Sequence, residues 1–131
     1  MENSPTHFKH EPLRDSTTHI RLLEIIAGTL GETVTCQLTE WPIESAPSYY
    51  ALSYTWGNPA ATTYITVNKQ AFSVRVNCEY ALQQAFASMA CKYYWIDAVC
   101  IDQTSRQEKN HQVAMMGKLY RKAAHVFACV G

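Results

Sequence analysis

Three carboxylates and a cysteine lie in the stretch WIDAVCIDQTSRQE, which runs from Trp95 to Glu108. The stretch begins as an apolar strand and ends as a polar turn that leads into a helix, so Asp97 and Asp102 flank a strand end. In open α/β sheets, ligands bind where strand ends, loops and helix N-termini meet. Carboxylates there can serve as general acids or bases, or can stabilise a cation. We therefore take this stretch as the first candidate site.

Glu108 supports two interpretations. With Ser105 it forms the S-x-x-E pattern of a capping box, in which each residue's side chain binds the other's backbone N–H. At about 100° per residue, however, Glu108 also lies close to Met115 and Leu119 around the helix. This places it at the rim of the apolar face, where a partly shielded carboxylate suits acid/base work or cation stabilisation. Both the structural and the catalytic interpretation of Glu108 stay open at this point.

The neighbouring side chains also have alternative roles. Asp102 has the position of an Asx-turn or cap residue, although it is also a candidate ligand-binding residue. Asp97 ends the strand, so its carboxylate must find donors or face solvent, and we expect it to order the site loop. Cys100 is disfavoured as a nucleophile because the apolar run around it holds no basic residue to lower its pKa.

A second candidate lies in YTWGN, after an earlier predicted strand. Tyr54 or Trp56 could stack on a ring-bearing ligand, and Gly57 would let the backbone approach it closely. The alternative for Trp56 is an aromatic that covers the end of the sheet. The glycine motifs of dinucleotide-binding, P-loop and α/β-hydrolase proteins are absent from the sequence, which disfavours those three classes.

Composition excludes some partners. The chain has 131 residues, a formal net charge of +0 and 47% hydrophobic residues. It therefore lacks the basic surface of a nucleic-acid binder and any lysine or arginine run for anionic lipid. It also has no secretory signal and no apolar stretch near the roughly 20 residues that cross a membrane. Five cysteines without a C-x-x-C pair indicate a cytoplasmic protein with free, mostly buried thiols and no metal site.

The predicted elements switch from strands to alternating helices and strands. Residues 1–18 are predicted to be a flexible tail. Strands are predicted over 20–26, 33–38, 50–56, 64–67, 72–76, 92–101 and 125–130, and helices over 77–90, where Asn77 is the N-cap, and over 105–124. The β-α-β-α-β order predicts an α/β layered sheet with flanking helices, mixed because 64–67 and 72–76 form a hairpin.

Two segments together resemble a known family. YYALSYTWGNP (49–59) and YYWIDAVCIDQTSRQEKNHQVAMMGKLYRKAAHVFACVG (93–131) are similar to the fungal heterokaryon incompatibility (HET) domain. The residues that carry the resemblance are Leu52, Ser53, Tyr54, Trp56, Gly57, Asn77, Ala81, Leu82, Trp95, Ile96, Asp97, Ala98, Cys100, Ile101, Asp102, Gln103, Glu108, Gln112, Val113, Met116, Tyr120 and Ala123. It covers residues 19–131. Because the family's domain normally continues further, we expect this domain to be truncated at its C-terminus.

The resemblance implies a fold and two classes of function. HET domains are considered similar to Toll/interleukin-1 receptor (TIR) domains, which implies a TIR-like, flavodoxin-like sheet. The first implied function is a signalling module that acts through self-association or protein partners in fungal non-self recognition and programmed cell death. The alternative is a TIR-like NAD glycohydrolase, with Glu108 as the catalytic carboxylate and NAD as substrate rather than cofactor. A third alternative is an inert, truncated product.

Overall fold

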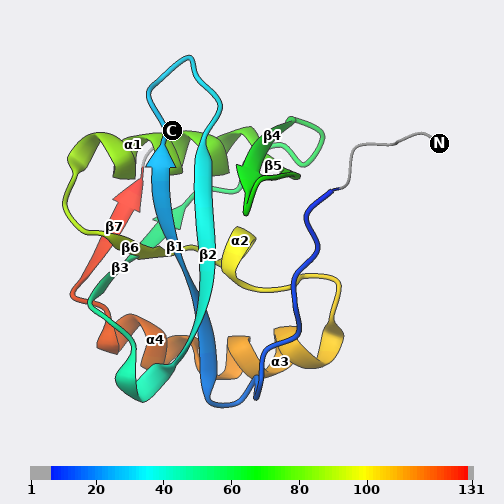
Figure 1. Ribbon diagram of the computed structural model, residues 1–131, viewed down its shortest axis with the longest axis vertical. Coiled ribbons are helices and arrows are strands. Elements are labelled where there is room, and N and C mark those ends of the chain that lie inside the picture. Colours follow the sequence, from blue (N-terminus) through cyan, green and yellow to red (C-terminus); the bar gives the residue numbers. More distant parts are fainter. Residues whose placement is uncertain (1–6, 130–131) are drawn as a thin grey trace.

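The computed structural model describes residues 7–129 of the chain (Figure 1). Its strands are β1 (His19–Ala27), β2 (Thr35–Pro42), β3 (Tyr49–Tyr54), β4 (Thr62–Val67), β5 (Gln70–Arg75), β6 (Tyr93–Trp95) and β7 (His125–Cys129). Its helices are α1 (Val76–Ser88), α2 (Asp97–Cys100), α3 (Arg106–Ala114) and α4 (Met116–Lys122), with a 3₁₀ turn at Ile43–Ser45. Among the described residues, no helix is both long and apolar enough to cross a membrane.

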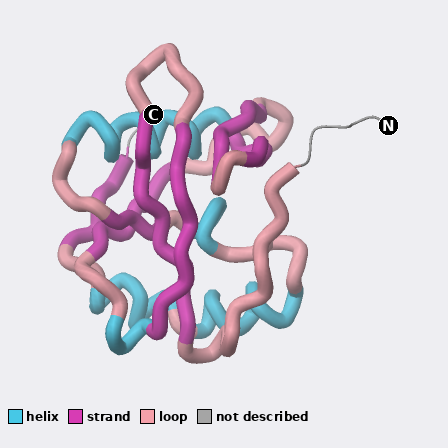
Figure 2. Tube along the Cα trace, viewed as in Figure 1, coloured by secondary structure: helices cyan, strands magenta, loops and turns pink. Residues whose placement is uncertain are grey.

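The described strands form one mixed sheet of seven, in the order β5-β4-β2-β1-β6-β3-β7. β3 pairs in parallel with both β6 and β7, because helical segments connect these strands in the chain. β1 is antiparallel to β2 and to β6. Helix α1 runs across one end of the view, and α3 and α4 run across the other (Figures 1 and 2). The predicted α/β layered fold with a mixed sheet is confirmed, while its likeness to TIR domains stays a prediction.

Strand β1 lies at the centre of the sheet and explains the apolar run IRLLEII. Ile20, Leu22 and Leu23 are all 0% exposed, so side chains on both faces of the strand are buried. A strand covered on both faces has a continuous apolar run rather than an alternating one. The run contains two charged residues, Glu24, which is partly exposed, and Arg21, which is buried.

The hairpin of β4 and β5 has the predicted place and turns at Asn68 and Lys69. Both residues have positive φ, 50° and 69°, as the two central residues of a tight hairpin turn require. The Asn68 side chain accepts a hydrogen bond from the backbone N–H of Leu38 at 2.7 Å, which fixes the turn beside β2.

Several predicted element boundaries are wrong, and three of them affect the later half of the chain. The strand expected over 92–101 ends at Trp95, and residues 97–100 form the short helix α2. The helix expected over 105–124 divides at Met115, which has φ −103° and ψ 8°, although neither proline nor glycine stands there. The N-cap of α1 is Arg75 rather than Asn77, because the Asn77 side chain instead donates to the backbone oxygen of Thr55.

The prediction of a flexible tail over 1–18 is also corrected for residues 7–18, which we call the N-terminal strap. Phe8 is a buried core residue, and its N–H donates to Ala71 O at 2.9 Å. The ring Nε2 of His10 lies 2.7 Å from Val99 O. The strap is therefore held by single aromatic contacts and hydrogen bonds, which have no periodic pattern. Residues 1–6 lie outside the described part of the chain.

Candidate functional site

Glu108 is buried and its carboxylate is fully engaged. It is 5% exposed, and its partner Arg21 is 4% exposed. Arg21 Nη1 donates to Glu108 Oε2 at 2.6 Å and Nη2 donates to Oε1 at 2.8 Å. The backbone N–H of Asp102 adds a third hydrogen bond, to Oε2 at 2.7 Å. Such a bidentate, charge-assisted pair is among the strongest polar contacts in proteins.

The same pair ties together several segments that are far apart in the sequence. The other bonds of the Arg21 guanidinium go to Cys100 O at 2.9 Å and Glu11 O at 2.7 Å. Arg21 in β1 therefore joins the strap, the end of α2 and the first turn of α3. The sequence analysis missed Arg21, and its only signal was a charged residue near the start of an apolar strand that also contains Glu24.

The capping box is half present. The Glu108 N–H donates to Ser105 Oγ at 3.2 Å, as the S-x-x-E pattern predicts. The Ser105 N–H, however, donates to Asp102 O, because the Glu108 carboxylate turns toward Arg21 instead. Glu108 thus combines a backbone cap with a buried ion pair.

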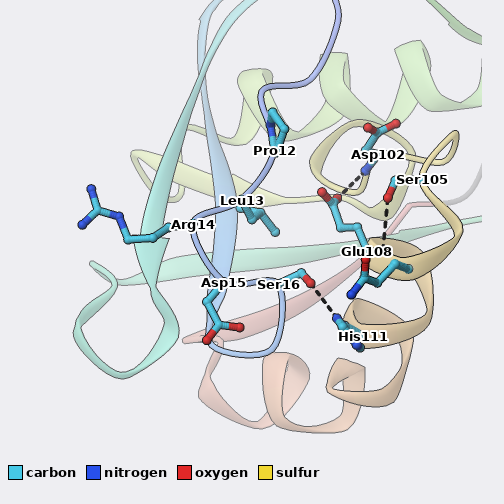
Figure 3. A pocket seen from close by; sticks show the side chains of 10 residues that line it. Pro12, Leu13, Arg14, Asp15, Ser16, Asp102, Ser105, Glu108 and His111 are labelled. Atoms are coloured by element: carbon cyan, nitrogen blue, oxygen red, sulfur yellow. Dashed lines mark hydrogen bonds between the residues drawn. The ribbon is translucent and has the colours of Figure 1, made fainter.

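One hollow of about 410 Å³ lies beside Glu108, and we call it the Glu108 hollow (Figure 3). It is lined by Pro12, Leu13, Arg14, Asp15, Ser16, Asp102, Ser105, Gln107, Glu108 and His111. Ser16 Oγ and His111 Nδ1 lie 2.6 Å apart across it. Its volume falls within the range of about 300–1,000 Å³ that is usual for small-molecule sites.

A second, smaller hollow of about 170 Å³ lies beside Trp56, and we call it the Trp56 hollow. It is lined by Tyr54, Trp56, Pro59, Thr62, Ser73, Val74, Arg75, Ala98 and Gln103. The rings of Tyr54 and Trp56 are stacked with centroids 6.1 Å apart. The Arg75 guanidinium carbon lies 4.7 Å from the centroid of the Trp56 ring, a cation–π distance.

The loop that carries Trp56 is held in place by Asn77. Asn77 Nδ2 donates to Thr55 O at 2.9 Å. Gly57 has φ +74°, and a Cβ added there would lie 2.5 Å from that same Nδ2 atom. Only glycine fits both the backbone conformation and the space. This contact explains why the W-G pair and the asparagine of the resemblance occur together.

The two aspartates have different environments. Burial raises the pKa of Asp97, although hydrogen bonds from the N–H groups of Asp97 and Ala98 oppose the rise. Burial also acts to raise the pKa of Asp102, but hydrogen bonds from Thr104 outweigh it and lower that pKa. Asp102 Oδ1 accepts from the Thr104 N–H at 3.0 Å and from its hydroxyl at 2.6 Å, which is the expected Asx-turn. Asp102 thus has the structural role that its position predicts.

The structure divides the predicted site residues between the two hollows. Tyr54 and Trp56 line one, while Asp102 and Glu108 line the other, and no lining residue is shared. Gly57 positions the Trp56 loop. Asp97 precedes Ala98, which lines the Trp56 hollow. Arg75 and Gln103, which the sequence analysis did not single out, complete the Trp56 hollow.

The described cysteines are free thiols, as predicted. Cys36, Cys78, Cys100 and Cys129 are buried and Cys91 is partly exposed. Burial raises the pKa of Cys100 well above its ordinary value, which keeps the thiol protonated and inert.

Comparison with known proteins identifies the family. Residues 49–131, more than half of the chain, match the family model described as heterokaryon incompatibility protein (HET). The chain belongs to the HET family. It is also 32% identical, over 91% of its length, to heterokaryon incompatibility protein 6, OR allele, of Neurospora crassa. The chain spans about one fifth (20%) of the length of that relative. No solved structure matches the chain.

Nine of the 22 residues that carry the HET resemblance are buried, and they include the centre of the motif. Trp95, Ile96, Cys100 and Ile101 are at most 1% exposed. Gln112 is 0% exposed, and its Nε2 donates to Ser16 O and His19 O, both at 2.9 Å. Two large apolar residues of the motif are exposed, Trp56 at 40% and Val113 at 51%.

Proposed function

We propose that this HET chain is a cytoplasmic signalling module of fungal heterokaryon incompatibility. It acts through self-association or protein partners in non-self recognition, and its output is programmed cell death. The family match and the similarity to the Neurospora protein support the incompatibility role. The burial of the central motif residues Trp95, Ile96, Cys100 and Ile101 supports a module in which this part of the motif chiefly builds the fold.

The hydrogen bonds of the Glu108 carboxylate favour this proposal over an enzymatic function. Its two oxygens accept three hydrogen bonds, two of them from a buried arginine. A carboxylate that stabilises an oxocarbenium-like cation must face the reacting atoms. Glu108 could do so only if its ion pair with Arg21 were broken, and that would leave a buried arginine without its counter-charge.

An NAD-hydrolysing enzyme is the second candidate, because Glu108 lines a hollow of about 410 Å³. That volume would admit part of a dinucleotide. The aromatic residues proposed to stack on its rings, however, line the other hollow. NAD enters this alternative as a substrate.

The deciding experiment removes the carboxylate without leaving a buried charge. In the double variant Arg21→Gln/Glu108→Gln, two amides replace the ion pair and can hydrogen-bond to each other. Wild type and double variant are expressed from an inducible promoter in a filamentous fungus, and cell death is scored. The purified proteins are assayed for NAD loss.

Under the signalling proposal, wild type and the folded double variant kill cells alike and neither consumes NAD. NAD loss by wild type that disappears in the folded double variant would overturn the proposal in favour of the enzyme. A wild-type chain that aggregates and does not kill would favour the inert alternative, whereas a soluble, cooperatively unfolding chain would argue against it. Strand β7, which pairs only with β3 among the described strands, is the edge on which that alternative predicts aggregation.

A further inference from the structure

Arg75 carries a positive charge that the described residues leave unpaired. None of the ion pairs among the described residues includes it. Within the described residues its side chain makes one hydrogen bond, from Nη1 to Gly57 O, which is long at 3.3 Å, although a guanidinium has five N–H donors. Arg21, by contrast, makes four hydrogen bonds. Arg75 therefore has donors available to an anion from outside the described chain.

The position of Arg75 is fixed rather than free. Its guanidinium lies over the Trp56 ring, and Trp56 is itself stacked on Tyr54. The loop beneath is held by the hydrogen bond from Asn77 Nδ2 to Thr55 O. A cation ordered in this way loses little conformational entropy when it binds, which favours recognition of a specific partner.

The size and composition of the Trp56 hollow indicate the kind of occupant. At about 170 Å³ it is smaller than the usual small-molecule site of about 300–1,000 Å³, and therefore fits a single side chain better than a nucleotide. Its rim combines Trp56, Tyr54 and Arg75, the three residue types that dominate binding energy at protein interfaces. Thr62 and Ser73 add hydroxyl groups to the lining.

We propose that the Trp56 hollow is the docking site for a carboxylate side chain presented by an acidic segment of a partner protein. The carboxylate pairs with the Arg75 guanidinium, and the neighbouring chain of the partner covers the exposed face of Trp56. Guanidinium and carboxylate match each other's planar geometry and bind through two parallel hydrogen bonds. This inference rests on the proposed signalling function, for which it names the binding surface.

Asp97 provides an internal check, because it adjoins the hollow through Ala98 and interacts electrostatically with Tyr54. Its negative charge opposes a second carboxylate. Asp97→Asn keeps the side chain's shape while removing the charge, so this variant should bind the acidic segment more tightly than wild type.

The test uses nuclear magnetic resonance of the isotope-labelled full chain. The probes are two capped glycine/serine peptides that differ only in one central residue, glutamate or glutamine. The signals followed are the Trp56 indole N–H and the Arg75 Nε–H. Arg75→Gln is the test variant. Arg121→Gln, the same charge change on the exposed surface of α4, is the matched control.

The glutamate peptide should shift both signals saturably in wild type and in Arg121→Gln. The glutamine peptide, and the glutamate peptide with Arg75→Gln, should bind about ten-fold or more weakly, as loss of a charged hydrogen bond implies. Equal shifts from the two peptides, or unchanged binding by Arg75→Gln, would overturn the inference. Saturable shifts from inorganic phosphate or NAD without any from the glutamate peptide would overturn it as well.

Failure of this inference is separable from failure of the proposed function. A chain that kills cells but does not discriminate glutamate from glutamine keeps its signalling role and loses this binding surface. A chain that binds the glutamate peptide selectively but never kills keeps the surface and loses the signalling role.

Discussion

The Arg21–Glu108 pair allows the sharpest quantitative prediction. Both side chains are at most 5% exposed, and they share two short hydrogen bonds. Glu108→Gln leaves the Arg21 charge buried without a counter-charge, and Arg21→Gln does the same to Glu108. Removing one partner of a buried ion pair costs about 3–5 kcal/mol in the free energy of unfolding. Single domains have only about 5–15 kcal/mol in total.

The double variant Arg21→Gln/Glu108→Gln should lose much less. It removes both charges, so no ion is left uncompensated. It does lose the bonds from Arg21 to Cys100 O and Glu11 O, each worth about 1 kcal/mol net. We therefore expect the double variant to lose about 2 kcal/mol, which is below either single variant and far below their sum.

Urea unfolding of the four proteins, followed by circular dichroism, measures this cycle directly. In thermal unfolding, each single variant should lower the Tm by about 12–20 °C at about 4 °C per kcal/mol for a chain of this length. Additive effects would refute the reasoning, as would single variants that cost less than about 1 kcal/mol. Either result would mean that the pair is open to water in solution and that Glu108 is free for chemistry.

Two further predictions concern the strap and the Trp56 loop. Burial lowers the pKa of His10 from 6.5, so the folded chain binds fewer protons there than the unfolded chain, and stability should fall as the pH drops through 6.5. His10→Gln should flatten the dependence of the urea midpoint between about pH 7.5 and 5, and an unchanged slope would contradict this assignment. Gly57→Ala and Gly31→Ala both place alanine at positive φ, but only Gly57→Ala also meets Asn77, at 2.5 Å. Gly57→Ala should therefore lose at least about 1 kcal/mol more than Gly31→Ala in urea unfolding, and equal losses would show that the loop can move.

Local patterns in the sequence predict much of the fold. The apolar run of β1, the hairpin around Asn68 and the helix–strand alternation of the later half all depend on neighbours in the sequence. The Asx-turn of Asp102 and half of the capping box at Ser105 are local as well, so they too were predicted correctly.

What the sequence could not predict depends on contacts between distant residues. The carboxylate of Glu108 binds Arg21, which is 87 positions away, in preference to the adjacent Ser105 N–H. The strap packs through Phe8 and His10 without any periodicity. Both cases show a long-range contact overriding the local interpretation, and the division of the predicted site into two hollows follows from the same cause.

The analogy with TIR domains assigns catalysis to the motif glutamate, but a residue's place in a motif does not determine what its side chain contacts. In this chain the Glu108 carboxylate binds Arg21 of β1 and the backbone N–H of Asp102, which gives it a structural role. Trp56 and the nearby Arg75 are different, because an aromatic ring that is 40% exposed and a guanidinium without a counter-charge among residues 7–129 contribute little to the core. Side chains that the fold does not need, yet holds rigidly, are better candidates for recognition than side chains that the fold cannot lose. On this argument the Trp56 hollow is the surface that we propose for recognition, and the Glu108 junction holds together the elements that present it.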